Sequence, residues 1–139
     1  MSIVQPSLPD ARVLDLFAGS GALGLEALSR GARSVDFIES SPQALATLRE
    51  NADALGAGSA ITVHRQDAIV FLERVRSDAY DVAFADPPYR LGLGEQVATR
   101  WIEVPFARVL GIEHAASESL PEGGDTRRYG DTAITLYRV

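Results

Sequence analysis

Cysteine and lysine are both absent from the sequence, and all 13 basic residues are arginine. Without thiols the chain forms no disulfide and offers no thiolate to a metal. No apolar stretch approaches the roughly 20 residues that a helix needs to cross a bilayer, and residues 1–12 lack the charged-then-apolar layout of a secretory signal. We therefore expect a cytoplasmic protein that does not associate with membranes.

Positive charge is scarce as well. The 13 arginines stand against 19 acidic residues, which gives a net charge of −6. Because contacts with phosphates supply most of the non-specific affinity for nucleic acids, this balance argues against a free-standing nucleic-acid binder. What the chain does have is 46% apolar residues in a length of 139, which suits one globular domain with a real core. We expect a single domain over residues 1–139, and a monomer.

Strand and helix patterns alternate along the chain. Short apolar runs predict strands, and apolar residues at helical spacing predict helices. The predicted strands are 12–18, 34–39, 60–65, 80–85 and 108–116, the predicted helices are 22–30, 42–55, 67–76 and 95–102, and a hairpin closes the chain over 127–139. Repeated strand–helix units imply an α/β fold of three layers, with a mostly parallel sheet between two layers of helices. The hairpin adds an antiparallel strand at the C-terminus.

A glycine-rich turn follows the first predicted strand. Gly19-Ser20-Gly21-Ala22-Leu23-Gly24 satisfies the pattern G-x-G-x-x-G between a strand and a helix. Glycines let the backbone turn sharply and approach a ligand closely at the carboxyl end of that strand. Several classes of cofactor-binding protein share the pattern, and an ordinary tight turn also satisfies it, so the motif alone does not identify a ligand.

Three carboxylates stand near the ends of the first three strands. Asp15 lies inside the first strand, where it can hold a cationic amine or fix the glycine loop. Glu39 ends the second strand 20 residues after Gly19, the expected place of an acid that accepts hydrogen bonds from both hydroxyls of a ribose. Asp67 follows the third strand and can accept from an adenine amino group, while the Ala68 amide reaches a ring nitrogen. Each carboxylate also has a purely structural alternative. Asp15 can be a buried acid that fixes the loop, Glu39 can be a partner of the next helix cap, and Asp67 can be a helix N-cap.

The fourth strand ends in Asp86-Pro87-Pro88-Tyr89. Two prolines cannot continue a β-ladder, so the strand must stop there, and the residues before them are held extended. The turn thus offers a rigid carboxylate, a backbone carbonyl and an aromatic ring. A simple turn after a strand is the alternative explanation.

Those groups suit an aromatic amine as the nucleophile. Asp86 and the Pro87 carbonyl can each accept one amine N–H, and Tyr89 can stack on the face of a base. With an activated sulfonium as the methyl donor, positioning of the two reactants supplies most of the catalysis, and neither a strong base nor a metal is needed. A base within structured nucleic acid must leave its stack to reach such a pocket.

At this point the sequence resembles the class I methyltransferases that act on amines, and more closely the RsmD family of small-subunit ribosomal RNA guanine-N2 methyltransferases. Residues 13–33 look like that family's cofactor loop and first helix, and Glu39-Ser40, the Asp67 region, Asp86 to Tyr89 and residues 128–132 follow in family order. The resemblance implies a Rossmann-like sheet of seven strands and S-adenosyl-L-methionine as donor, without a metal. It also implies a guanine of the small-subunit ribosomal RNA, in an assembling 30S subunit, as acceptor. The cofactor residues expected on this basis are Asp15, Phe17, Ala18, Gly19, Ser20, Gly21, Glu39, Ser40, Asp67, Ala68 and Asp86, and the expected catalytic residues are Asp86, Pro87, Pro88 and Tyr89.

One departure from the family pattern concerns the start of the chain. Members usually carry a basic N-terminal hairpin, an Arg-Pro segment and a helix before the first strand, whereas here about a dozen residues precede it. The family segment would supply RNA contacts and close over the cofactor. A cofactor-binding domain without activity is therefore one alternative function.

Other functions remain open on the sequence. One alternative is another amino methyltransferase, acting on adenine-N6 in DNA or RNA or on glutamine-N5 in a protein, although an Asn in place of Asp86 would favour the glutamine enzyme. A nicotinamide dehydrogenase shares the glycine pattern but needs a substrate domain. Arg90, Arg127 and Arg128 are candidates for phosphate contacts, or else solvated arginines. His64 and His114 lie in strand patterns with no second metal ligand at a suitable spacing, so we expect them to pack or to face solvent.

Overall fold

The computed structural model describes residues 2–139. These residues form seven strands and four α-helices, which alternate as far as the fifth strand, and every strand and helix predicted from the sequence is present. The elements are η1 (Ser2–Ser7), β1 (Arg12–Leu16), α1 (Ala22–Ser29), β2 (Ser34–Glu39), α2 (Pro42–Ala54), η2 (Gly58–Ala60), β3 (Ile61–Arg65), α3 (Ala68–Leu72), β4 (Tyr80–Ala85), α4 (Leu93–Glu103), β5 (Ala107–Ala115), β6 (Asp125–Tyr129) and β7 (Thr132–Arg138). Within the described part of the chain, no helix is both long and apolar enough to cross a membrane.

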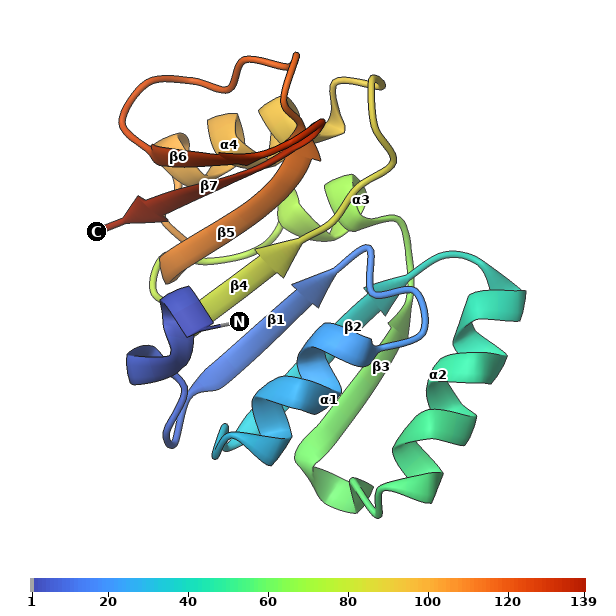
Figure 1. Cartoon of the computed structure of the whole chain (residues 1–139). Coiled ribbons are helices and arrows are strands. Elements are labelled where there is room, and N and C mark those ends of the chain that lie inside the picture. Colours follow the sequence, from blue (N-terminus) through green and yellow to red (C-terminus); the bar gives the residue numbers. More distant parts are fainter. Residues whose placement is uncertain (1) are drawn as a thin grey trace.

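All seven strands form one sheet in the order β3-β2-β1-β4-β5-β7-β6. Strands β1 to β5 run parallel, and β7 pairs antiparallel with both β5 and β6. Figure 1 shows α1 and α2 on one face of the sheet and α3 and α4 on the other. The predicted three-layer fold and its antiparallel C-terminal strand are thus confirmed. The chain order reverses at β1, and ligands of open α/β sheets bind outside the strand ends at such a reversal.

Each face of the sheet has its own apolar core. Under α3 and α4 the buried side chains include Trp101 and Tyr137, whose ring centroids are 5.5 Å apart. The Trp101 indole N–H also donates to the Ala107 carbonyl over 2.8 Å, which satisfies its one polar group. Under α1 and α2 the core includes Phe37 and Leu48, both fully buried. These two cores fix the helices and leave the strand ends free to form a site.

Several element ends differ from the prediction by one or more residues, and three of them bear on the site. The helix predicted over 67–76 ends at Leu72, because the Arg100 guanidinium of α4 donates to the carbonyls of Leu72 (2.7 Å) and Glu73 (3.1 Å) and so satisfies the helix end. The strand predicted to reach Ala18 ends at Leu16, because Phe17 turns to a φ of +57°. Helix α4 begins at Leu93, two residues earlier than predicted.

A chain of hydrogen bonds that starts at the buried His114 joins the last three strands. Nε2 of His114 on β5 lies 2.8 Å from the Thr135 hydroxyl on β7, which in turn lies 2.7 Å from the Thr126 hydroxyl on β6. Nδ1 of His114 lies 3.0 Å from the Ala115 carbonyl. His114 is therefore a packing residue with both ring nitrogens paired. Strand β6 itself lies at the edge of the sheet, and all five of its residues are exposed.

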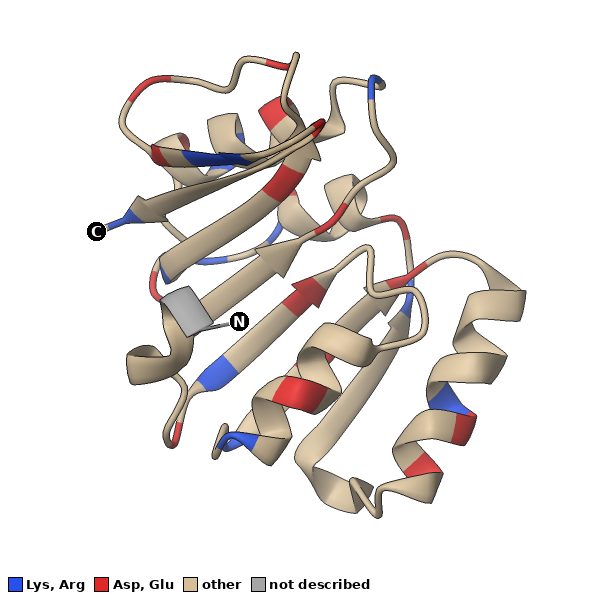
Figure 2. Ribbon diagram, viewed as in Figure 1, with Lys and Arg blue, Asp and Glu red and all other residues tan. Residues whose placement is uncertain are grey.

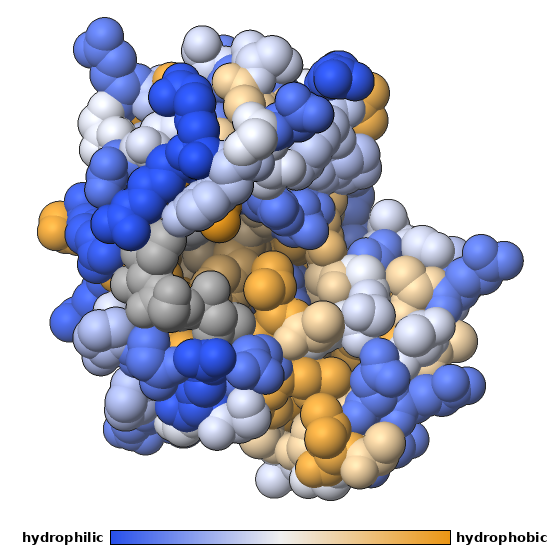
Figure 3. Space-filling model, in the orientation of Figure 1, coloured by the Kyte–Doolittle hydropathy of each residue, from blue (hydrophilic) through white to orange (hydrophobic). Residues whose placement is uncertain are grey.

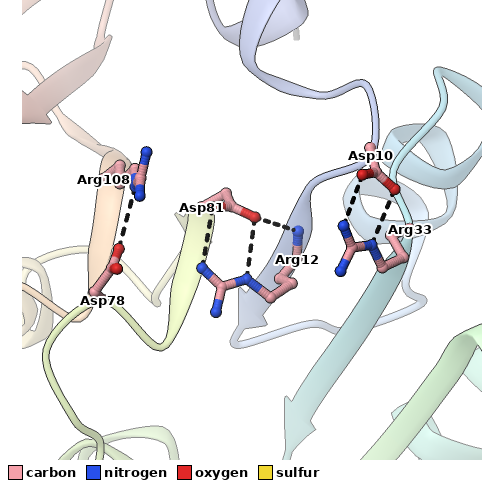
Figure 4. Close-up of polar contacts among 6 residues, drawn as sticks. All are labelled: Asp10, Arg12, Arg33, Asp78, Asp81 and Arg108. Atoms are coloured by element: carbon pink, nitrogen blue, oxygen red, sulfur yellow. Dashed lines mark hydrogen bonds and ion pairs between the residues drawn. The ribbon is translucent and has the colours of Figure 1, made fainter.

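Ion pairs gather at the amino ends of the strands (Figure 4). Arg12 at the start of β1 donates to Asp81 of β4 from its backbone amide (2.8 Å) and from two guanidinium nitrogens (3.2 and 3.1 Å). These bonds hold the pKa of Asp81 below its ordinary value. The exposed pairs Asp10–Arg33 and Asp78–Arg108 flank this contact. Opposite charges are thus matched at this end of the sheet.

Candidate functional site

The glycine loop after β1 takes a conformation that its residue types permit. Gly19 and Gly21 have φ values of +58° and +82°, in the left-handed region that glycine enters without strain. The space beyond Gly19 is open, since a Cβ built there would meet no atom within 4 Å. At Gly24 a Cβ would lie 2.4 Å from the Phe37 ring. The third glycine of the motif therefore serves the packing of α1 on the sheet, and the first leaves room for a ligand.

Glu39, at the end of β2, holds this loop from the side. Its Oε1 accepts from the Gly19 amide and its Oε2 from the Ser41 amide, each over 2.8 Å. The expected structural role beside the Ser41 cap is therefore present. The carboxylate also lines a cleft in front of the loop, so the expected contact with a ribose stays a prediction.

Asp15 on β1 fixes the glycine loop through a buried hydrogen bond. It is 1% exposed, and its Oδ2 accepts from the Gly24 amide over 3.0 Å. Burial raises the pKa of Asp15 to about 8; the bond from Gly24 opposes this, and the nearby Asp86 and Glu39 add to it. The structure thus gives Asp15 the loop-fixing role, and its predicted contact with the cofactor is untested.

Asp67 caps α3. Its Oδ1 accepts from the amides of Ile69 (2.9 Å) and Val70 (3.0 Å), which confirms the predicted N-cap. Within residues 2–139 its Oδ2 has no hydrogen-bond partner, and the residue lines the same cleft as Glu39. A cap and a ligand contact are compatible in this position.

The Asp86-Pro87-Pro88-Tyr89 turn leaves β4 at the carboxyl edge of the sheet. Asp86 is exposed there, and Pro87 is buried beneath it. The turn is held by the C-terminal part of the chain, because the Tyr89 hydroxyl lies 3.1 Å from that of Thr132 on β7 and the Arg90 amide donates over 3.0 Å to Glu118 in the loop after β5. The carboxylate, the prolines and the ring are therefore held together rather than left on a loose loop.

One open cleft unites most of the residues singled out from the sequence. Its volume is about 660 Å³. We call it the loop cleft; its lining residues are Phe17, Glu39, Ser40, Asp67, Asp86, Pro87, Pro88, Tyr89 and Leu93. The register Leu16↔Ala85 explains this meeting, because it brings the ends of β1 and β4 side by side. The predicted residues that do not line it are Asp15, Ala18, Gly19, Ser20, Gly21 and Ala68.

A second cleft lies on the other side of Asp86. It has a volume of about 190 Å³, and we call it the sheet cleft; its lining residues are Val4, Leu23, Phe84, Ala85, Asp86, Gly111, Glu113, Ile134 and Leu136. Figure 3 shows an apolar hollow bordered by hydrophilic side chains on this face. Asp86 belongs to both clefts, so it stands at their junction.

Glu113 is the site residue that sequence reasoning missed. It lies on β5, and a hydrogen bond with Asp86, together with burial, raises the pKa of Glu113 to about 7. The available signal was an acidic residue inside a mainly apolar strand, the same signal that drew attention to Asp15. In Figure 2 acidic segments lie at or just beyond the arrowheads of the central strands. Within residues 2–139 none of these acids pairs with an arginine, so this end of the sheet favours a cationic or proton-donating ligand.

The strand order, the glycine loop and the Asp-Pro-Pro-Tyr turn beside it define a Rossmann-like class I methyltransferase fold. The model of the family described as conserved hypothetical protein 95 matches residues 1–138. The chain therefore belongs to the RsmD family of methyltransferases.

Individual relatives agree with this assignment. The ribosomal RNA small subunit methyltransferase D of Haemophilus influenzae is 31% identical over 98% of this chain and 74% of that protein. The Escherichia coli protein of the same name is 44% identical over 67% of this chain, which is 46% of its own length. A solved structure of a putative methylase from Haemophilus influenzae superposes with a TM-score of 0.85 and 30% identity, over 99% of this chain and 91% of that one. Within residues 2–139 no three His, Asp or Glu side chains converge as a metal site.

Proposed function

We propose that this chain is an S-adenosyl-L-methionine-dependent methyltransferase that methylates the exocyclic N2 amine of a guanine in small-subunit ribosomal RNA. The observation that carries the proposal is the position of Asp86, at the junction of two clefts and beside the glycine loop. The names of the relatives in Haemophilus influenzae and Escherichia coli support ribosomal RNA as the substrate. We propose the assembling 30S subunit as the partner.

The loop cleft fits an adenosyl group. Gly19 leaves open space for a ligand to approach the backbone, and the second lone pairs of the Glu39 carboxylate remain for ribose hydroxyls. The free Oδ2 of Asp67 suits an adenine amino group. These residues, with Phe17 and Ser40 on the same wall, would hold the cofactor.

When bound, the cofactor would supply an activated methyl group on its sulfonium, and the amine that accepts this group would give up one proton. The chain's own residues prepare the amine for this step. Asp86 and the Pro87 carbonyl each accept one amine N–H, which orients the nitrogen lone pair, and Asp86 is the nearest acceptor for the released proton. Tyr89, held through Thr132, offers its ring to the face of the base.

The test has two arms. Nucleosides of small-subunit RNA from a deletion strain are compared with the parent by mass spectrometry, and loss of N2-methylguanosine is expected. Unchanged N2-methylguanosine contradicts the proposal, whereas loss of a methyladenosine instead favours an adenine-N6 enzyme.

The second arm uses the purified protein and Asp86→Ala. We expect methylation to be abolished while the affinity for S-adenosylhomocysteine, measured by calorimetry, stays within about threefold, because Asp86 acts on the acceptor. Asp125→Ala, which removes an exposed carboxylate from β6, is the matched control and should keep full activity. A wild-type protein that binds the cofactor but methylates no small-subunit RNA would match a cofactor-binding domain without activity.

A further inference from the structure

Glu113 shares the sheet cleft with Asp86. It lies one residue beyond Ile112, which pairs with Ala85, so β5 brings its carboxyl next to that of Asp86. The other walls of this cleft are apolar and include Leu23, Phe84 and Ile134. The cleft therefore combines flat apolar surface with two carboxyl groups at one end.

No structural contact of Glu113 explains why a carboxyl group stands at this position. Within residues 2–139 it receives no hydrogen bond from any backbone amide and forms no ion pair; its one polar neighbour is Asp86. The further acids near Asp86 are Asp15 on β1, whose pKa burial raises to about 8, and Glu39 on β2. Towards the sheet edge β7 presents Ile134, and Arg127 of β6 lies beyond it. A partly buried carboxylate beside a second carboxylate, here Asp86, is costly unless a ligand supplies donors.

We propose that Glu113 is a specificity-determining residue of the acceptor site, where its carboxylate accepts the ring N1–H of the guanine whose exocyclic amine is held by Asp86. The inference rests on the proposed function and identifies the pocket that would bind the target guanine. The sheet cleft would take the base, and the loop cleft the cofactor, on opposite sides of Asp86.

The donor pattern of the base supports this assignment. The Watson–Crick edge of guanine presents two adjacent donors, the N1–H and the N2 amine, and enzymes read an extruded base on this edge. Two neighbouring carboxylates are acceptors and match both donors. Adenine presents an amine beside an N1 lone pair, which would face the Glu113 carboxylate without a proton between them. The pair therefore selects guanine, and the apolar walls suit its ring faces.

The experiment measures kcat/KM for small-subunit RNA between pH 5.5 and 9 for the wild type, Glu113→Gln and the control Glu122→Gln. The control removes an equal charge from an exposed loop position. Because Glu113 must be ionised to accept the N1–H, the wild-type value should rise about tenfold per pH unit below 7 and level off above it. Glu113→Gln should lower kcat/KM at pH 8 by about 10–100-fold and lose the ionisation near pH 7. Its affinity for S-adenosylhomocysteine should be unchanged.

Failure of this inference differs from failure of the proposed function. If the wild type makes N2-methylguanosine but its kcat/KM shows no ionisation between pH 6 and 8, the role of Glu113 is wrong, whether or not the variant folds. The same holds if Glu113→Gln keeps wild-type kcat/KM, or if it loses cofactor affinity, which would make Glu113 a cofactor contact. If the wild type makes no N2-methylguanosine, the proposed function itself fails.

Discussion

The Glu39 carboxylate joins two turns of the chain, because it accepts the Gly19 amide on one oxygen and the Ser41 amide on the other, each over 2.8 Å. A residue at the end of β2 thereby sets the shape of the loop that follows β1. The same carboxylate lines the loop cleft. Loop geometry and the proposed cofactor contact therefore depend on one side chain.

Glu39→Gln should weaken cofactor binding. The amide group would place an N–H against one of the two backbone donors, and it removes the charge that strengthens both hydrogen bonds. We expect the Kd for S-adenosylhomocysteine to rise by about 10–100-fold, measured by calorimetry. Glu50→Gln, an exposed change on α2, is the control and should leave the Kd unaltered. Equal affinities in all three proteins would remove Glu39 from the binding site.

Gly24→Ala should destabilise the fold. The new Cβ would lie 2.4 Å from Cε1 of Phe37 and 2.8 Å from Cγ1 of Val35, so α1 must move away from the sheet. Overpacking of this kind costs about 1–3 kcal/mol, measured by urea unfolding. Gly94→Ala in α4 is the matched comparison, because its Cβ would come no closer than 3.4 Å to another atom. That variant should be neutral or gain up to about 1 kcal/mol from helix propensity.

Asp15→Asn should flatten the dependence of stability on pH. The folded protein binds the Asp15 proton more tightly than the unfolded chain does, since burial raises the pKa from 3.8 to about 8. Wild-type stability attributable to this group therefore falls as the pH rises through that window, by at most about 1.4 kcal/mol per pH unit. Unfolding free energies at pH 5 and pH 8 check this: the difference between the two pH values should be smaller in the variant. A wild type with equal stability at both would contradict the prediction.

Asp81→Ala should loosen the amino ends of β1 and β4. The change removes three hydrogen bonds from Arg12 and leaves its backbone amide without an acceptor, which costs about 1–3 kcal/mol. Because the pKa of Asp81 is lowered in the folded state, the wild-type advantage should shrink as the pH falls below about 4. Arg33→Ala breaks the exposed pair with Asp10 and should change the stability little. Thermal unfolding of both variants at pH 7 and pH 3.5 separates the two cases.

Local signals predict the elements and most of the loop cleft. The alternation of apolar runs with helical spacing fixes the order of elements, and the parallel fold then brings the residues after β1, β2, β3 and β4 to one edge. The sequence alone therefore assigns Asp86 and Glu39 to a common site. The cap role of Asp67 followed from its position before an apolar helical run.

What local signals could not supply depends on contacts between distant residues. Helix α3 stops at Leu72 because of an arginine 28 positions later in the chain, Arg100. Glu113 becomes a neighbour of Asp86 only because β5 pairs with β4. Phe17 turns into the left-handed region although a bulky side chain disfavours it, and nothing in its own sequence neighbourhood demands this. The sheet cleft was therefore missed, whereas the loop cleft was not.

The exposed outer strand β6 has a consequence for how copies of the protein meet. Its peptide groups on the side away from β7 pair with no other strand of the sheet. Edge strands of this kind can pair with a second chain and so promote aggregation. Here the edge carries Asp125, Arg127 and Arg128, all exposed. A second copy pairing with this edge would have to remove water from these guanidinium groups and bring them close together, so the charges oppose fibre-like growth at the β6 edge of the sheet.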